Sequence, residues 1–258
     1  MTIAISQRTA EVDGLGIAWR EAGDAPVLYL HGVPNSSVMW EPFLERTGGV
    51  APDLPGFGDS DKPSHFDYSI AGYGGLLETF VDDLGLRDIT LVMHDWGVVG
   101  LTLAQRRPDL VQRLVLMSTV PLVAGYRWHQ VARAWRMPFV GEMAMGFTFR
   151  WNFRRAMPES AADEAWRHFD HGTQRAILKL YRSAPERKLE QAGAGLGEVK
   201  APALVVWGDG DPYIPPEFAQ RTADALSGPA TVEVVEGAGH WSWLDRPGVV
   251  DSVAAFAS

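Results

Sequence analysis

Short runs of consecutive apolar residues alternate along this chain with longer segments in which apolar residues recur at helical spacing. A wholly apolar run of about four to eight residues predicts a strand that is buried on both faces of a sheet. The alternation of such strands with helices favours an α/β fold, with a mostly parallel central sheet and helices on both faces. The predicted strands are 27–30, 49–53, 90–93, 114–117, 203–207 and 231–235, and the predicted helices are 69–84, 98–105 and 247–256.

The pattern changes after residue 120, and no strand-like run occurs again until about residue 201. We therefore expect a core formed by residues 1–120 and 202–258, with residues 121–201 inserted as a helical cap, or lid. Ligands of open α/β sheets bind at the carboxyl ends of the strands, so the cap is expected to lie over that edge. The insertion is rich in Trp, Arg, Met and Phe, and prolines interrupt its short helices at Pro138, Pro158 and Pro185.

The composition is that of a globular protein, and it excludes several kinds of chemistry. The 258 residues are 46% hydrophobic and 21% charged, with a formal net charge of −9. An acidic chain lacks the clustered cations that bind a nucleic-acid backbone. Cysteine is absent, which excludes disulfides and thiolate chemistry. The chain starts without the plan of a signal peptide and contains no apolar stretch long enough to span a bilayer. We expect a cytoplasmic protein without a nucleic-acid or membrane partner.

The most informative segment is 90–97, in which an apolar run ends abruptly in His94-Asp95-Trp96-Gly97 and a second apolar run starts at once. This order predicts a strand, a tight turn and a helix, with the carboxylate of Asp95 at the tip of the turn. A serine usually occupies this tip in the nucleophile elbow. A carboxylate that attacks a saturated carbon forms an ester that water can cleave, whereas attack on a carbonyl would give an anhydride. Asp95 therefore indicates displacement at sp3 carbon, although an Asp after a strand is also a common helix N-cap.

Two segments near the carboxyl end supply partners for this carboxylate. His240 ends the glycine-rich run 237–240, and an imidazole on such a loop suits general-base work. Asp209 and Asp211 follow the strand-like run 203–207, and one of them can orient the imidazole as the acid of a triad does. The resulting chain order of nucleophile, acid and base is that of the α/β-hydrolases.

Residues 31–34, His-Gly-Val-Pro, follow the first predicted strand and can direct backbone N–H groups at developing negative charge. We interpret His31 and His94 as structural, because His31 can hydrogen-bond the loops near the elbow and the His94 side chain should point away from Asp95. Pro34 is a candidate for a cis peptide. No metal-ligand spacing and no phosphate-binding glycine loop occurs, so neither a metal nor an organic cofactor is implied.

Together these motifs resemble the α/β-hydrolases with an Asp nucleophile, the group that contains epoxide hydrolases and haloalkane dehalogenases. The resemblance implies that Asp95 forms an alkyl ester, and that His240 activates the water that hydrolyses it. It selects Asp211 over Asp209 as the acid that orients His240, by the spacing Trp-Gly-x-x-Asp. It also implies that the backbone N–H groups of Val33 and Trp96 stabilise the oxyanion. The position two before the nucleophile is usually small in this family, and here it is Met93.

The leaving group separates the two activities, and the resemblance favours an epoxide hydrolase that gives a vicinal diol. Such enzymes use tyrosine hydroxyls of the cap to donate a proton to the epoxide oxygen. Tyr181, which precedes an Arg as in the late cap motif of the family, is the first candidate donor, and Tyr126 is the second. Trp241, directly after His240, is also typical of epoxide hydrolases.

Haloalkane dehalogenation is the alternative, because halide ions need N–H donors that keep their protons. This chain retains Trp96 after the nucleophile, but Val33 stands where many dehalogenases have Asn. A cap tryptophan could replace that Asn, and the candidates are Trp128, Trp135, Trp151 and Trp166. The segments 35–37 and 58–63 are similar to those of dehalogenases.

A small-molecule receptor without catalysis is a third possibility, since such receptors can keep the pocket and even the triad. In each case the expected ligand is a small apolar electrophile, with water as co-substrate for an enzyme, and the expected state is a monomer or homodimer. A lid over a substrate must present an apolar underside. The predicted pocket residues are Pro34, Trp128, Trp135 and Trp241.

Overall fold

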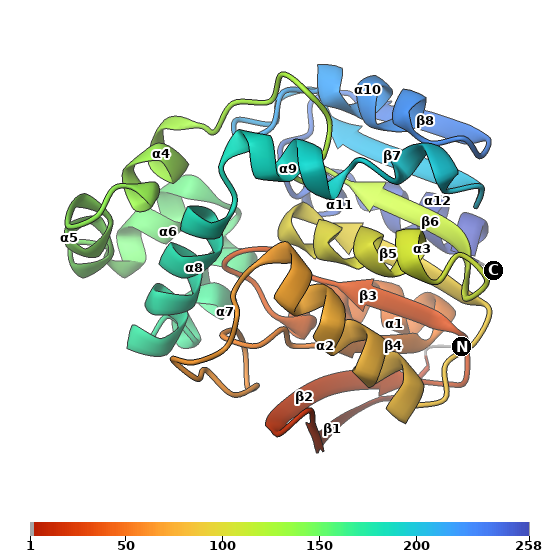
Figure 1. Cartoon of the computed structure of the whole chain (residues 1–258), viewed down its shortest axis with the longest axis horizontal. Helices are drawn as coiled ribbons and strands as arrows, with labels where there is room; N and C mark the ends of the chain where they lie inside the picture. Colours follow the sequence, from red (N-terminus) through yellow and green to blue (C-terminus); the bar gives the residue numbers. More distant parts are fainter. Residues whose placement is uncertain (1–2, 258) are drawn as a thin grey trace.

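The computed structural model describes residues 3–257, and at its centre lies an eight-stranded sheet (Figure 1). The strands lie in the order β1-β2-β4-β3-β5-β6-β7-β8. β1 and β2 form an antiparallel hairpin, β2 is antiparallel to β4, and the remaining strands are parallel. The mostly parallel sheet that the sequence predicts is therefore confirmed. The strand bounds are Ile5–Val12 (β1), Leu15–Ala22 (β2), Val27–Leu30 (β3), Gly49–Pro52 (β4), Ile89–His94 (β5), Val111–Met117 (β6), Ala203–Gly208 (β7) and Ala230–Val235 (β8).

Helices cover both faces of this sheet, as expected from the alternating pattern. The core on one face contains the buried side chains of α2, α3 and α10, and the core on the other face contains those of α1, α11 and α12. Ser69 caps α2, as its hydroxyl accepts a hydrogen bond from Gly72 N. The helices are α1 (Glu41–Thr47), α2 (Ile70–Asp83), α3 (Leu101–Arg106), α10 (Glu217–Ala225), α11 (Ser242–Asp245) and α12 (Gly248–Ala257).

Six helices lie between β6 and β7, and Figure 1 shows most of them beyond the carboxyl ends of the strands. Pro138, Pro158 and Pro185 each separate two of them, as the sequence predicts. We use the word cap for the first five, because the sixth runs beside α3, where Gln105 Nε2 donates a hydrogen bond to Ala192 O at 3.0 Å. The cap helices are α4 (Gln130–Arg136), α5 (Val140–Gly146), α6 (Arg150–Ala156), α7 (Glu159–Arg167) and α8 (His171–Ser183), and the sixth is α9 (Glu186–Ala192).

Buried polar contacts fasten α7 and α8 to loops of the core. Ser36 Oγ donates to the buried carboxylate of Glu164 on α7 at 2.5 Å. At the start of α8, Thr173 Oγ1 donates to Gly56 O at 2.9 Å. The polar contacts of α5 are of another kind, because its Glu142 forms an ion pair with Arg182 of α8, within the cap itself. One side of the cap is thus tied to the core by polar contacts, whereas the side-chain polar contacts of α5 found among residues 3–257 lie within the cap.

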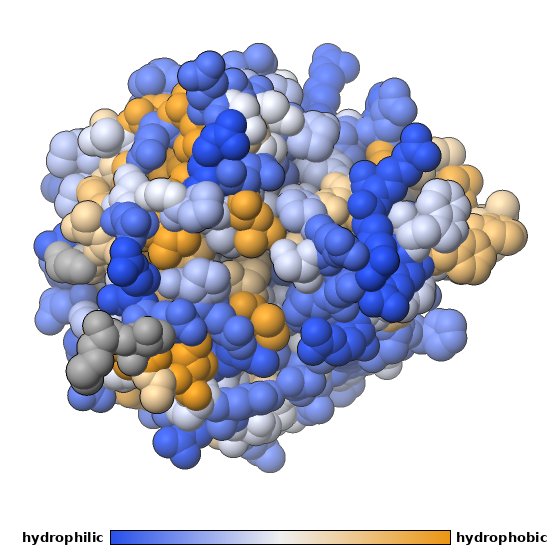
Figure 2. Space-filling view, turned by 180° about the vertical axis from the view of Figure 1, so that it is seen from behind, coloured by the Kyte–Doolittle hydropathy of each residue, from blue (hydrophilic) through white to orange (hydrophobic). Residues whose placement is uncertain are grey.

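The outer side of α4–α6 carries an exposed group of apolar side chains. Figure 2, which views the molecule from behind, shows pale orange atoms at the end where α5 lies. We call this group the cap patch. It consists of Val131, Met137, Phe139, Val140, Met143, Phe147, Phe149 and Trp151.

No helix among residues 3–257 is long and apolar enough to cross a membrane. The sequence-based expectation of a cytoplasmic location stays a prediction, as do the domain bounds and the choice between monomer and homodimer.

The sequence analysis misses the hairpin of β1 and β2. β1 is an edge strand, and its residues from Ser6 to Glu11 are all exposed. Its sequence therefore lacks the continuous apolar run that marks the buried strands.

The packing of α2 against the segment after β5 can be tested with two neighbouring glycines. A Cβ on the buried Gly74 would lie 2.3 Å from Thr102 Oγ1 and 2.9 Å from Thr102 Cβ, whereas a Cβ on Gly75 would meet no atom within 4 Å. We expect Gly74→Ala to lower the free energy of unfolding by about 1–3 kcal/mol through overpacking. Gly75→Ala should raise it by up to about 1 kcal/mol, because alanine favours the helix. Urea denaturation measures both, and equal effects would contradict this packing.

Candidate active site

The nucleophile elbow forms as the sequence predicts, with Asp95 at its tip. β5 ends at His94, and Asp95 has a φ of 49°, a left-handed conformation that is uncommon outside glycine. The chain then turns directly into a 3₁₀ helix, η2 (Asp95–Gly100), which leads into α3. A Cβ at Gly97 would lie 2.0 Å from Leu30 O, so only glycine permits this close approach of helix and strand.

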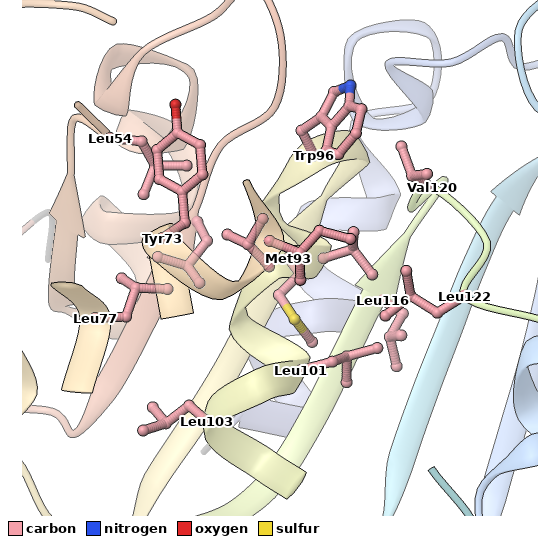
Figure 3. Close-up of a cluster of buried hydrophobic side chains, with 14 of the residues drawn as sticks. Leu54, Tyr73, Leu77, Met93, Trp96, Leu101, Leu103, Leu116, Val120 and Leu122 are labelled. Atoms are coloured by element: carbon pink, nitrogen blue, oxygen red, sulfur yellow. The ribbon is translucent and has the colours of Figure 1, made fainter. Parts of the chain in front are cut away.

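Met93 fits below the elbow without opening it. Its side chain is fully buried and points into the cluster between the sheet and α3, near Leu101 and Leu116 (Figure 3). The ring of Trp96 points the opposite way, with its indole nitrogen directed away from this cluster. The elbow thus directs residue 93 into the core and residue 96 towards the cap.

Two backbone N–H groups donate hydrogen bonds to the Asp95 carboxylate. Val33 N donates to Asp95 Oδ2 at 2.8 Å, and Trp96 N also donates to this carboxylate. The loop before Val33 approaches so closely that a Cβ on Gly32 would lie 2.4 Å from Asp95 Cβ. The Val33–Pro34 peptide is cis. This arrangement agrees with the oxyanion site that the resemblance implies, and Asp95 Oδ1 forms no hydrogen bond with Val33 N.

His240 and Asp211 complete the constellation from the loops after β8 and β7. His240 Nδ1 lies 2.7 Å from Asp211 Oδ2, and His240 Nε2 lies 3.9 Å from Asp95 Oδ1. The second distance exceeds that of a hydrogen bond, so the imidazole faces the carboxylate without binding it directly. Asp209 instead accepts a hydrogen bond from Gly237 N and makes no contact of this kind with His240.

Asp211 is itself fixed by the backbone that follows it. Its Oδ1 accepts hydrogen bonds from Tyr213 N at 2.8 Å and Ile214 N at 3.0 Å. Its other oxygen is therefore aimed at His240. Because this carboxylate accepts a hydrogen bond from the ring, Nδ1 carries the hydrogen and Nε2 is free to accept a proton from water.

Burial and neighbouring charges shift the pKa values of Asp95 and His240. Burial raises the pKa of Asp95 to about 6, although the charge of His240 and the two backbone N–H groups oppose the rise. Burial alone would lower the pKa of His240, but the charge and hydrogen bond of Asp211, together with the charge of Asp95, outweigh it and raise that pKa. Asp95 must be ionised to attack and His240 must be neutral to accept a proton, so both requirements fail as the pH falls.

A cavity of about 420 Å³ lies between the elbow and the cap. Asp95 and His240 line it, and so do all four pocket residues that the sequence predicts. Trp96 and Asp211 are not among the lining residues, but the Trp96 ring packs directly against two that are, Trp128 and Tyr181. The predicted residues on the wall are Val33, Pro34, Asp95, Tyr126, Trp128, Trp135, Tyr181, His240 and Trp241.

The family of the chain follows from comparisons with known proteins. Residues 25–247 match the family described as alpha/beta hydrolase fold. The chain belongs to the α/β-hydrolase fold family. A haloalkane dehalogenase of Bradyrhizobium diazoefficiens is 32% identical to it, and the alignment covers 91% of this chain and 88% of that protein. Epoxide hydrolase 1 of Caenorhabditis elegans is 28% identical, covering 88% of this chain and 63% of that protein.

Solved structures agree with this assignment. The crystal structure of the haloalkane dehalogenase DbeA from Bradyrhizobium elkani has a TM-score of 0.83 and 28% identity, covering 98% of each chain. The protein is thus an α/β-hydrolase of the group that contains haloalkane dehalogenases and epoxide hydrolases. Its fold class and its assignment as a hydrolase, both predicted from the sequence, are confirmed.

In this α/β-hydrolase, Tyr181 and Tyr126 both line the cavity that Asp95 lines. Tyr181, on α8, is fully buried and packs edge-on against the Trp96 ring with centroids 5.1 Å apart. Burial, and then the negative charge of Asp95, raise the pKa of each tyrosine well above 10. The Tyr126 hydroxyl has no hydrogen-bond partner among residues 3–257.

The candidate indole donors differ in whether their N–H groups are free. Trp128 stacks on Trp96, but its N–H donates to Ala184 O at 2.9 Å. The N–H of Trp241 donates to Asn35 Oδ1 at 3.0 Å. The N–H of Trp96 lies beside the Tyr181 hydroxyl but forms no hydrogen bond of acceptable geometry within the described chain.

The other cap tryptophans separate in the same way. Trp135 lines the cavity and packs edge-on against Tyr181. Trp151 is exposed on the cap patch, and Trp166 packs against Phe153 and Phe169; neither lines the cavity. These two are therefore badly placed to bind a leaving group.

Several residues around the site have roles that the sequence analysis does not predict. Tyr213 packs on the His240 ring, and its hydroxyl donates a hydrogen bond to Ala156 O of α6 at 2.6 Å. This contact joins the core to the cap beside the cavity. His129 lines the cavity, and burial lowers its pKa to about 4. No motif marks either residue, because each is recruited by the path of a loop.

The two histidines interpreted as structural do contact the loops around the elbow. His31 Nε2 accepts a hydrogen bond from Leu54 N at 2.9 Å, and His94 Nε2 lies 3.0 Å from His240 O. His94 therefore positions the loop of His240 from behind. No group of three or more potential metal ligands occurs among residues 3–257.

The role of Asp211 in raising the pKa of His240 can be tested with a matched pair of substitutions. We expect Asp211→Asn to lower the pKa of His240 by about 1–3 units, since it removes an adjacent negative charge. Asp209→Asn should leave that pKa unchanged, because an amide oxygen can still accept from Gly237 N. NMR titration of the imidazole, assigned with His240→Gln, measures the pKa. An equal pKa in both variants would show that Asp211 does not act on His240.

Proposed function

We propose that this α/β-hydrolase cleaves the carbon–halogen bond of small apolar haloalkanes and releases halide and an alcohol. The sequence analysis ranks epoxide hydrolysis first and dehalogenation second. The dehalogenase relative and the solved dehalogenase structures support the reverse order. The observation that carries the proposal is the buried indole N–H of Trp96, which adjoins Asp95 and lacks a good acceptor among the described residues.

In the first step, Asp95 Oδ1 attacks the carbon that bears the halogen. The carbon–halogen bond breaks, its electron pair leaves with the halide, and an ester forms between Asp95 and the alkyl group. A buried N–H without a well-aligned acceptor costs about 1–3 kcal/mol. The Trp96 N–H, which lies beside the Tyr181 hydroxyl without a hydrogen bond of good geometry, would therefore gain an acceptor from a halide bound at this wall of the cavity. Val33 N keeps Oδ2 in place during the attack, which orients Oδ1 along its line of approach.

In the second step, a water deprotonated by His240 attacks the carboxyl carbon of the ester. The oxyanion then develops on Oδ2, which already accepts a hydrogen bond from Val33 N, and Trp96 N is a second donor to this carboxylate. One such oxyanion donor lowers the activation barrier by about 3–4 kcal/mol. The water oxygen stays in the Asp95 carboxylate, and the alcohol leaves with the original Oδ1.

Tyr181 supplies the second leaving-group donor that Val33 cannot supply. Its hydroxyl lies beside the Trp96 indole, on the wall of the cavity. Because burial and the charge of Asp95 raise its pKa, this hydroxyl retains its proton. A donor that retains its proton suits a halide, which needs hydrogen bonds and no proton transfer.

Epoxide hydrolysis is the second candidate function, and the pair of tyrosine hydroxyls favours it. Tyr181 and Tyr126 both line the cavity with Asp95, as an epoxide oxygen would require. The order of the reaction would be the same, except that a tyrosine would protonate the alkoxide. The raised tyrosine pKa values make this transfer less favourable, which places it second.

The covalent step can be tested by trapping. We expect His240→Gln to form the ester but fail to hydrolyse it, so incubation with a bromoalkane should add the mass of one alkyl group to Asp95. Asp95→Asn is the matched control and should acquire no mass. Peptide mass spectrometry measures both. If neither bromoalkanes nor epoxides give an adduct, the chain is a receptor rather than an enzyme of this mechanism.

The leaving group can be identified by removing one donor at a time. We expect Trp96→Phe to lower kcat/KM for bromoalkanes about 10- to 100-fold, because it removes a hydrogen bond to a charged group. Trp128→Phe changes a ring of the same kind whose N–H is already paired, and its effect should be smaller. Halide release and diol formation are assayed side by side. Diol without halide, abolished by Tyr181→Phe, would establish epoxide hydrolysis instead.

A further inference from the structure

The cap patch is unusually apolar for a protein exterior. Phe139 is 83% exposed, Phe147 is 71% exposed and Trp151 is 61% exposed, and they lie on consecutive short segments of α4–α6. Large exposed apolar groups that gather in one place mark interaction surfaces, including those that bind membranes. Phe139 also adopts a φ of 64°, so the backbone holds this side chain outward at some conformational cost.

The charge of this region is opposite to that of the rest of the protein. Residues 127–155 contain six Arg and one Glu, whereas the remaining chain contains 17 Lys and Arg against 31 Asp and Glu. Arg127, Arg133 and Arg155 form no ion pair with any residue from 3 to 257. The cap patch is therefore bordered by unpaired positive charge on an acidic molecule.

The same surface leads to the active site. Val131 and Phe147 belong to the cap patch and also line the cavity, as does the exposed Arg155. Asp95 and His240 line its buried end. An apolar molecule held at the cap patch would thus lie at the entrance to the cavity.

We propose that the cap patch docks on a lipid bilayer containing anionic lipids, and that apolar substrate enters the cavity from that bilayer. Aromatic side chains favour the interface between lipid and water, and each Arg near an anionic surface strengthens binding about fivefold. The acidic body is repelled by such a surface, so the cap end faces it. The docking itself does not depend on the chemistry, whereas the delivery of substrate rests on the proposed function.

Docking of this kind needs no membrane-spanning helix, so it is compatible with the absence of one among residues 3–257. The sequence-based expectation of no membrane partner considered spanning segments alone. A symmetric contact between two cap patches is less favourable, because it would bring the unpaired Arg side chains of two copies together. Self-association is accordingly an outcome that the test must detect.

Co-sedimentation of the full chain with vesicles tests the docking. We expect binding to phosphatidylcholine vesicles with about 30% phosphatidylglycerol at low salt, weaker binding at high salt, and little binding to phosphatidylcholine alone. The double variant Phe139→Asn with Trp151→Gln should lower the partition coefficient about tenfold or more, since both rings leave the interface. Asn tolerates the backbone conformation at residue 139. Arg133→Gln should lower the coefficient about fivefold.

Matched controls lie outside the cap. Val234→Thr changes an exposed apolar residue on β8, and Lys200→Gln removes a charge ahead of β7; neither should alter binding. No binding to anionic vesicles, or equal binding by the cap variants and the controls, would overturn the proposal. Sedimentation velocity without lipid provides a second readout. A dimer that the double variant abolishes would assign the patch to contact between copies instead.

Activity separates this inference from the proposed function. If the docked enzyme draws substrate from the bilayer, anionic vesicles should speed turnover of a long-chain bromoalkane by the wild type more than by the double variant. Turnover of a short, water-soluble bromoalkane should be equal in both. Vesicle binding without halide release would leave docking standing and refute dehalogenation. Halide release without vesicle binding would do the reverse.

Discussion

The site depends on the unequal treatment of the two oxygens of one carboxylate. Oδ2 of Asp95 accepts a hydrogen bond from Val33 N, while Oδ1 lies 3.9 Å from Nε2 of His240. The backbone N–H of Trp96 is a further donor to this carboxylate. This asymmetry decides which oxygen attacks, which becomes the oxyanion, and where the hydrolytic water must stand. It exists because the elbow and the loop after β3 meet with almost no space between them, and glycine at residues 32 and 97 makes that approach possible.

Burial of the Asp95 carboxylate has two opposite effects on its ability to attack. A buried carboxylate is a stronger nucleophile without its water shell, but burial raises its pKa towards neutrality. The positive partner His240 and the two N–H donors counter that rise. The aromatic wall around the cavity excludes water from the leaving group while leaving one indole N–H and two tyrosine hydroxyls close to it. The selectivity between halide and epoxide therefore depends on a few donors in an otherwise apolar pocket.

The chemistry could be predicted from the sequence to a larger extent than the surfaces. The elbow, His240 and the Asp after β7 lie at strand ends, and strand ends are marked by apolar runs that stop abruptly. The sequence does not show whether an indole N–H has a hydrogen-bond acceptor. Trp96, Trp128 and Trp241 are the same residue type, and they differ in the acceptor that the fold places beside each N–H. The same holds for the cap. Its aromatics were expected on the underside of a lid, and Trp128 and Trp135 are there, but Phe139 and Trp151 face outwards. Short helices without a clear apolar stripe do not reveal which side is covered.

The link between Ser36 and Glu164 has a mechanical meaning. Ser36 lies three residues after Val33, in the loop that supplies an oxyanion donor, and its partner sits on α7, where burial raises the carboxyl pKa. A displacement of α7 away from the core would break the hydrogen bond between Ser36 and Glu164. The loop that contains Val33 would then lose one of its contacts. The cap is thus held to the core by buried polar contacts at α7 and α8. At α5, no comparable polar contact with the core is found among the described residues. An opening of the cap at α5 would admit molecules to the cavity without breaking the contact of Ser36 with Glu164, so the loop of Val33 would stay in place.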